Sequence, residues 1–199
     1  SMHRGRFQGL LADAVRERIG PDAIKCNHHL VDFTQQTDQV TANFVDKRSN
    51  QPVGSFDADG LIGADGIHSS VRSYFYPDEG PARWSGNMLW RMTVEIDPVL
   101  GGQTMIAVGN SQTKVVGYEI SAEAKRRGKS LFNWIAEVKL ADSDAALSRR
   151  EDWNQASAVD EFLSHFSDWE FDWLSVPELA KKTEGVWSFP MVDRDPVDN

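Results

Sequence analysis

The sequence predicts an α+β protein in which a mostly antiparallel sheet is joined to a smaller lobe of helices and strands. Three observations support this fold class. Before Pro77, segments with helical spacing alternate with strand-like segments. After Pro77, four strand-like runs are separated by Gly, Pro, Asn and Ser turns, which is typical of antiparallel sheets. Apolar residues make up 40% of the 199 residues, enough to bury a core.

The part before Pro77 begins with a predicted helix. Its apolar residues recur at the spacing of one buried helix face, and they are Phe7, Leu10, Leu11, Ala14, Val15 and Ile19. Gly20, as a left-handed residue, and Pro21, as a breaker, end this helix. The strand-like runs 23–33, 40–46 and 53–63 predict a hairpin or meander whose last strand is buried and central. Residues 67–76 have helical spacing.

The part after Pro77 is dominated by the predicted sheet, with strand-like runs at 84–97, 103–110, 113–121 and 130–139. The polar run 141–157 predicts a surface excursion. Helical spacing returns in 159–169 and 176–182, and 184–192 predicts a last strand. The expected division is therefore 1–76, 77–188 and a returning segment, 189–199.

Composition excludes several classes of protein. A net charge of −9 argues against a nucleic-acid surface, which needs clustered Lys and Arg. One cysteine, Cys26, fits a reducing compartment, and no apolar run approaches the roughly 18 residues of a membrane span. We therefore expect a cytoplasmic protein. No hydrolase or nucleotide-loop motif is present, and His28 and His29, adjacent on a strand, cannot share a metal.

The stretch LIGADGIHSSVR, residues 61–72, is the strongest candidate for a site. Asp65 is expected at the carboxyl edge of a sheet, where open α/β sheets bind ligands. Gly63 and Gly66 lack Cβ atoms, so a ligand can approach the backbone closely. The alternative is that Asp65 only caps the helix that follows, a role that Asp often fills.

The whole stretch resembles the Asp-Gly fingerprint of the FAD-dependent aromatic hydroxylases, the class A flavoprotein monooxygenases. Two further segments agree with it in order and spacing: HRGRFQGLLADAV at 3–15 and FPMVDRDP at 189–196. The resemblance covers essentially the entire chain. It implies a partial FAD- and NAD(P)-binding, Rossmann-like lobe at 1–76, a substrate-binding sheet domain at 77–188, and a return to the first lobe at 189–199.

What the resemblance implies for function is a single-component monooxygenase. A reduced nicotinamide would reduce FAD, and a flavin hydroperoxide would hydroxylate an electron-rich aromatic small molecule. FAD contacts are expected from Arg4, Leu30, Gly63, Asp65, Gly66 and Arg72. Leu30 would contribute only its backbone, near the adenine. For Arg72, the alternative to a contact with phosphate is an ion pair on the helix surface.

The substrate is expected against the sheet. Met88 and Trp90 alternate onto one face of the strand and Arg91 onto the other. Trp90 either stacks on an aromatic substrate or packs the core. No residue of the chain is expected to act as a chemical catalyst or metal ligand.

Two departures from the family pattern concern the cofactor. The sequence contains no G-x-G-x-x-G loop for the FAD pyrophosphate and no Gly-Asp motif after residues 193–196. We therefore expect a middle segment of a longer enzyme. The alternatives are a non-catalytic binding module and a flavin-linked reductase or epoxidase of the same fold. The identity of the substrate, the choice of NADH or NADPH, and the oligomeric state stay open.

The 199-residue polypeptide is predicted not to hold FAD tightly. Each charge-assisted hydrogen bond contributes about 1.5–3 kcal/mol, and association costs at least about 4 kcal/mol. Contacts from Arg4 and Asp65 therefore cannot replace a pyrophosphate loop. Purified protein should be colourless, and a fluorescence titration should show no saturation at submicromolar FAD. Tight binding would mean that other residues carry the flavin site.

Overall fold

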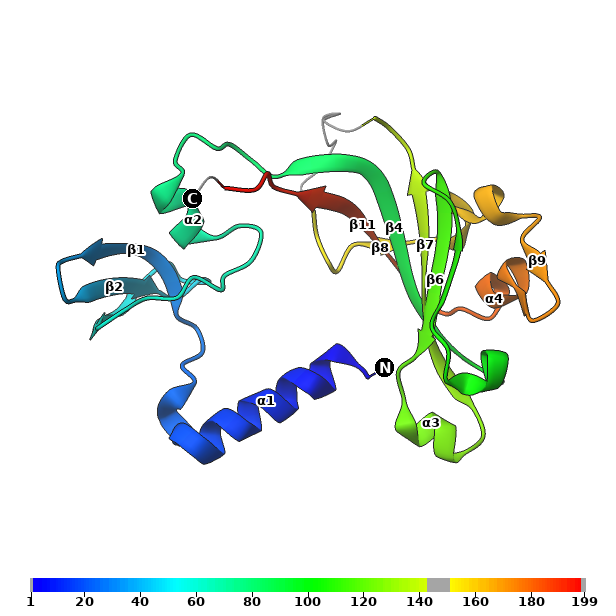
Figure 1. Cartoon of the computed structure of the whole chain (residues 1–199), viewed down its shortest axis with the longest axis horizontal. Helices are drawn as coiled ribbons and strands as arrows, with labels where there is room; N and C mark the ends of the chain where they lie inside the picture. The colour runs from blue at the N-terminus through cyan, green and yellow to red at the C-terminus, as the bar shows by residue number, and fades with distance from the viewer. Residues whose placement is uncertain (1, 143–150, 198–199) are drawn as a thin grey trace. The chain divides into compact units, whose positions relative to one another are not determined.

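The computed structural model describes residues 2–142 and 151–197, and it divides the chain into two compact units. The sheet unit comprises Ser1–Gln8 and Arg83–Asp193, and the meander unit comprises Gly9–Ala82 and Arg194–Asn199 (Figure 1). Residues 143–150, within the expected surface excursion, lie outside the described part. Among the described helices, none combines the length and the apolar character needed to cross a membrane.

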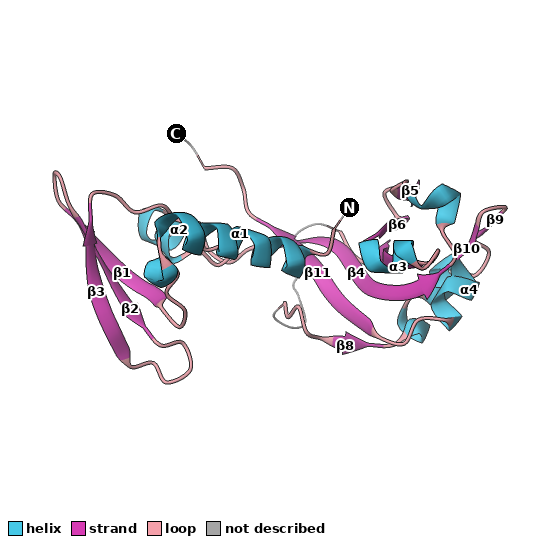
Figure 2. Cartoon of the chain, turned by 90° about the horizontal axis from the view of Figure 1, so that it is seen from below, coloured by secondary structure: helices cyan, strands magenta, loops and turns pink. Residues whose placement is uncertain are grey.

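The meander unit is built on three antiparallel strands in the order β1-β2-β3, which confirms the predicted meander (Figure 2). The strands are β1 (His29–Gln35), β2 (Val40–Val45) and β3 (Pro52–Ala58). Helix α1 (Arg4–Ile19) and the 3-10 turn η1 (Pro21–Ala23) precede them, and helix α2 (Ser70–Phe75) follows. A small core of Phe33, Val40 and Ala42 lies between the meander and α2.

Three expectations for the meander unit are wrong. Helix α1 buries none of its residues, and Leu10 is 60% exposed, so its apolar stripe does not form the expected buried face. Gly20 ends the helix at a φ of +130° and a ψ of 159°, which is not the left-handed helical conformation. Strand β3 is an exposed edge strand that ends at Ala58, and Ile62, 92% exposed, has no strand partner to bury it.

The sheet unit holds a six-stranded sheet in the order β5-β6-β7-β4-β11-β8, in which all neighbouring strands are antiparallel, as the sequence predicts. The strands are β4 (Arg83–Ile96), β5 (Ile106–Gly109), β6 (Thr113–Glu119), β7 (Ser130–Lys139), β8 (Ala156–Ser157) and β11 (Val186–Asp193).

Short helical segments and one small hairpin complete the sheet unit. They are η2 (Val99–Gly102), α3 (Ala122–Arg126), η3 (Val159–Glu161), η4 (Leu163–Phe166), β9 (Glu170–Phe171), β10 (Leu174–Ser175) and α4 (Val176–Lys181). The helical run expected over 159–169 is therefore two 3-10 turns rather than one α-helix.

The two faces of the six-stranded sheet differ in cover. On one face, Trp90, Phe132 and Trp134 are buried beneath η4 and α4, which contribute Phe166 and Leu179 to the same core. The exposure of β7 alternates strictly along the strand, buried on this covered face and partly open on the other. We call the second face the open face.

Gly117 on β6 is predicted to be irreplaceable in this core. A Cβ at Gly117 would lie 2.3 Å from Cζ of Phe132, which is 1% exposed and cannot move away. Gly117→Ala should therefore destabilise the sheet unit by roughly 1–3 kcal/mol. All seven Trp residues belong to this unit, so the midpoint of unfolding by Trp fluorescence should fall.

The control for this prediction is Gly60→Ala. Its Cβ would meet nothing within 4 Å, and it lies in the meander unit, so the Trp-detected midpoint should not change. Equal midpoints for Gly117→Ala and the wild type would contradict the packing argument.

Candidate functional site

The Asp-Gly loop lies between β3 and α2 in the meander unit and caps the helix. Oδ2 of Asp65 accepts a hydrogen bond from the backbone N–H of Ser70 at 2.6 Å, and a longer one from Val71 at 3.4 Å. Oγ of Ser69 accepts from the N–H of Arg72 at 2.9 Å. Asp65 therefore precedes a helix as predicted, but it follows an irregular loop and not the end of a strand.

The charge state of Asp65 reflects these contacts. Partial burial raises the pKa of its carboxyl, but hydrogen bonds from Ser69, from the N–H of Ser70 and from other backbone groups outweigh it. The pKa therefore lies below the ordinary value of 3.8, and Asp65 is an anion at neutral pH.

The carboxylate of Asp65 also lines a cavity of about 460 Å³, so the capping and ligand-binding alternatives are compatible. Leu30 and Gly63 line the same cavity, which places three of the predicted FAD contacts together. Four basic side chains also line this cavity, namely those of His28, His29, Lys47 and His68.

Glycine suits the two loop positions, 63 and 66, for different physical reasons. Gly66 has a φ of +81° and nothing within 4 Å of its missing Cβ, so the backbone there is open to a ligand. A Cβ at Gly63 would lie 2.8 Å from Cβ of Val71, so this glycine allows the loop to pack on α2. Gly63 lines the cavity beside Asp65 and Gly66 does not, so the expected close approach of a ligand at both glycines stays a prediction.

Arg72 is engaged in a network of ion pairs within the meander unit. Its Nε donates to Glu79 at 2.8 Å, and its Nη2 donates to the carbonyl of Asp195 at 2.6 Å. Nη1 of Arg194 donates to the same Glu79 carboxylate at 2.8 Å, and Nε of Arg194 donates to the carbonyl of Ile67. The structure therefore shows Arg72 in the ion-pair alternative, and its contact with a phosphate stays a prediction.

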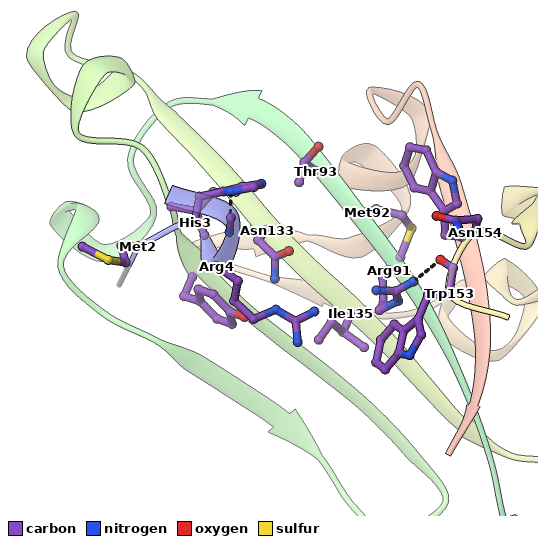
Figure 3. Close-up of a pocket in the computed structure, with 14 residues that line it drawn as sticks. Met2, His3, Arg4, Arg91, Met92, Thr93, Asn133, Ile135, Trp153 and Asn154 are labelled. Atoms are coloured by element: carbon purple, nitrogen blue, oxygen red, sulfur yellow. Dashed lines mark hydrogen bonds between the residues drawn. The ribbon is translucent and has the colours of Figure 1, made fainter. Parts of the chain in front are cut away.

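A second cavity, of about 450 Å³, lies on the open face of the sheet unit (Figure 3). Arg91 on β4 lies directly opposite Ile135 on β7 and Trp187 on β11 in the register of the sheet. Arg4, for which the family resemblance implies a contact with the flavin, lines the same cavity. Trp153, from the segment before β8, forms part of the wall.

Met88 and Trp90, the predicted substrate contacts, do not line this cavity. Trp90 is 3% exposed, packs against Phe162 and donates its Nε1–H to Oγ of Ser157 at 3.1 Å. Met88 packs against the same core. Trp90 therefore packs in the core, which was the alternative to a substrate contact, and stacking of a substrate on its ring stays a prediction.

The open face contains residues that sequence reasoning did not select. They are Thr93, Tyr118, Asn133, Ile135, Trp153 and Trp187. The alternation of side chains along a strand places Arg91 and Trp90 on opposite faces of the sheet. It does not determine which of the two faces the helical segments cover. Among the described residues, no group of three or more His, Cys, Asp or Glu side chains could hold a metal ion.

Comparison with known proteins identifies the family. Residues 6–184 match the family model described as "FAD binding domain", so the chain belongs to that family. Its relatives include named hydroxylases and monooxygenases, and the resemblance to FAD-dependent aromatic hydroxylases is confirmed.

Two relatives and one solved structure show what this chain is similar to. Phenazine 1,6-dicarboxylic acid hydroxylase PhzS of Lysobacter antibioticus is 34% identical over 198 residues, covering 99% of this chain and 48% of that protein. The 3-amino-4-hydroxybenzoate 2-monooxygenase PtnB3 of Streptomyces platensis is 26% identical over 188 residues, covering 92% and 42%. The structure of Klebsiella pneumoniae HpxO with FAD and uric acid has a TM-score of 0.64 at 22% identity, covering 94% and 43%. This structure supports the fold, and the chain spans about half the length of the curated relatives it matches.

The cap made by Asp65 is predicted to depend on pH. Because the folded pKa of Asp65 is depressed, its charge stabilises α2 fully above the ordinary value of 3.8, and that stabilisation is lost as the pH falls through the lower folded value. At pH 7, Asp65→Asn should weaken the cap by about 0.3–1 kcal/mol through the lost charge, and Ser69→Ala should weaken it by about 1 kcal/mol. Amide hydrogen exchange at Ser70 and Arg72 measures this effect.

Acid should separate the two variants. The difference between wild type and Asp65→Asn should shrink at pH below 3.8, whereas the deficit of Ser69→Ala should persist, since a hydroxyl does not titrate there. A difference for Asp65→Asn that is independent of pH would show that its charge contributes nothing to the cap.

Proposed function

We propose that the chain is part of an FAD-dependent monooxygenase that uses NAD(P)H to hydroxylate an aromatic small molecule. The observation that carries this proposal is the Asp-Gly loop, which directs the anionic Asp65 into a cavity in a chain of the FAD-binding family. A cytoplasmic location is part of the proposal, since the single cysteine, Cys26, is free and exposed.

The residues of the meander unit fit a nucleotide cofactor. The cavity beside Asp65 offers a carboxylate that can accept hydrogen bonds from ribose hydroxyls, and Gly63 lines the same cavity. Leu30, on β1, lines the same cavity and would face the adenine side. When bound, the flavin supplies the activation of oxygen, a chemistry that no protein side chain provides.

The sheet unit fits the second requirement, a place for an aromatic ring. Trp153 and Trp187 are 50% and 42% exposed at the open-face cavity, although large aromatic rings are usually more buried. Arg4 lines this cavity and would contact the flavin, because its guanidinium can donate to phosphate or ribityl oxygens. The role of the chain is then to bind and orient both molecules and to exclude water.

The test uses the longest natural polypeptide that contains these residues. Purified with FAD, it should consume NAD(P)H and oxygen faster when an electron-rich aromatic compound is added, and mass spectrometry should find a product with one more oxygen atom. Asp65→Ala should lower the retained flavin several-fold. Ser175→Ala, which removes the hydroxyl cap of α4 in the sheet unit and lies outside both cavities, should retain it.

Two outcomes would contradict the proposal. A lower melting temperature for Asp65→Ala with an unchanged flavin content would leave Asp65 with its capping role alone. Oxidation of NAD(P)H with no oxygenated product from any aromatic compound would favour a flavin-linked reductase.

A further inference from the structure

The side chain of Arg194, in the returning segment, contacts the Asp-Gly loop. Its Nε donates a hydrogen bond to the carbonyl of Ile67 at 2.8 Å, two residues after Asp65. Ile67 and Asp65 both line the cavity of about 460 Å³ in the meander unit, and Arg194 does not. We propose that Arg194 is a positioning residue, which holds the loop so that the carboxylate of Asp65 faces this cavity. This inference rests on the proposed function and adds a residue that acts on the cofactor site through the loop.

The guanidinium of Arg194 bridges three acceptors. Besides the bond from Nε to Ile67, Nη1 donates to the carboxylate of Glu79 at 2.8 Å and to the carbonyl of Gly80 at 2.9 Å. The side chain is only 13% exposed, so water competes little for these donors. Because the donors of a guanidinium have fixed directions in one plane, the contacts at Glu79 and Gly80 also fix the direction of the third, at Ile67.

Glu79 is itself anchored to helix α2. Nε of Arg72, on this helix, donates to the Glu79 carboxylate at 2.8 Å, and Asp65 caps the first turn of the same helix. These contacts close a ring, since the loop is attached to α2 directly through Asp65 and a second time through Arg194 and Glu79. All members of the ring belong to the meander unit. Loss of the contact between Arg194 and Ile67 would therefore remove one of the two attachments.

The Asp-Gly loop needs this second attachment because its own sequence gives it little rigidity. Strand β3 ends at Ala58, and the described residues between it and α2 form no helix or strand. Gly66, between Asp65 and Ile67, has a φ of +81° and lacks the side chain that would restrict its backbone. The hydrogen bond from Arg194 acts on the residue directly after this glycine, and it thus limits the freedom that Gly66 gives to Asp65.

The experiment follows the ionisation of Asp65 in the 199-residue chain by carbon NMR of its carboxyl group, with Asp65→Asn to assign the signal. In the wild type, partial burial raises the pKa of Asp65, but the capping hydrogen bonds outweigh it and hold the pKa below the ordinary value of 3.8. Arg194→Lys keeps the positive charge, but one ammonium on a flexible stem does not reproduce the fork. The capping hydrogen bonds should then weaken, and the pKa of Asp65 should rise toward 3.8.

Two further variants control this result. Arg16→Gln removes a guanidinium of the same unit, which pairs with Asp13 at 3.1 Å outside the cavity, and should leave the pKa of Asp65 unchanged. Glu79→Gln weakens the anchor of Arg194 and should raise the pKa as Arg194→Lys does. Since the loss of a negative charge would by itself lower the pKa of Asp65, a rise in Glu79→Gln reports the position of the loop. Glu79→Gln is also the second test if Arg194→Lys disturbs the fold.

Flavin retention is measured separately, on the longest natural polypeptide that contains these residues, and Arg194→Lys should lower it several-fold. A wild-type pKa of Asp65 in both Arg194→Lys and Glu79→Gln would overturn the inference, and Arg194 would then only fasten the returning segment. A raised pKa with full flavin retention would overturn it as well. Neither result contradicts the proposed hydroxylation, which is measured by product formation. A wild type that binds no flavin, with a raised pKa in the variants, would contradict the proposed function alone.

Discussion

The sheet unit depends on the register of β4 with β7. Residues 87–96 of β4 pair continuously with 130–139 of β7, so alternate side chains of β4 point to the core and to the open face, where Arg91 and Thr93 line the cavity. Trp90 and Arg91 are neighbours in the chain and have opposite roles for this reason alone. A slip of one residue would bury the guanidinium and expose the indole, and the packing of Trp90 against Phe162 in the core opposes it.

In the meander unit, one carboxylate both caps a helix and lines a cavity. Asp65 satisfies backbone N–H groups at the start of a six-residue helix, and it remains exposed to a cavity. The hydrogen bonds that stabilise its charge also fix its direction, so a ligand meets an oriented anion. The cap and the proposed cofactor contact of Asp65 thus arise from one geometry.

Glu79 organises the return of the chain to the meander unit. Its carboxylate receives Arg72 from α2 and Arg194 from the returning segment, and the Arg194 side chain is only 13% exposed. Hydrogen bonds from Arg72 lower the pKa of Glu79, so the carboxylate stays charged between the two arginines. Two segments far apart in the sequence therefore share one anion, which explains why residues 194–199 belong to this unit.

The sequence by itself determined the α+β class, the meander, the antiparallel sheet and the position of Asp65 before a helix, because periodicity, turn residues and capping chemistry are local. It also separated Trp90 from Arg91 by alternation. Only the tertiary structure decided that Trp90 lies beneath η4 and α4, that Arg91 meets Trp153, and that Glu79 binds Arg72 and Arg194. These outcomes depend on which face another segment covers, and the strand pattern is the same for either face.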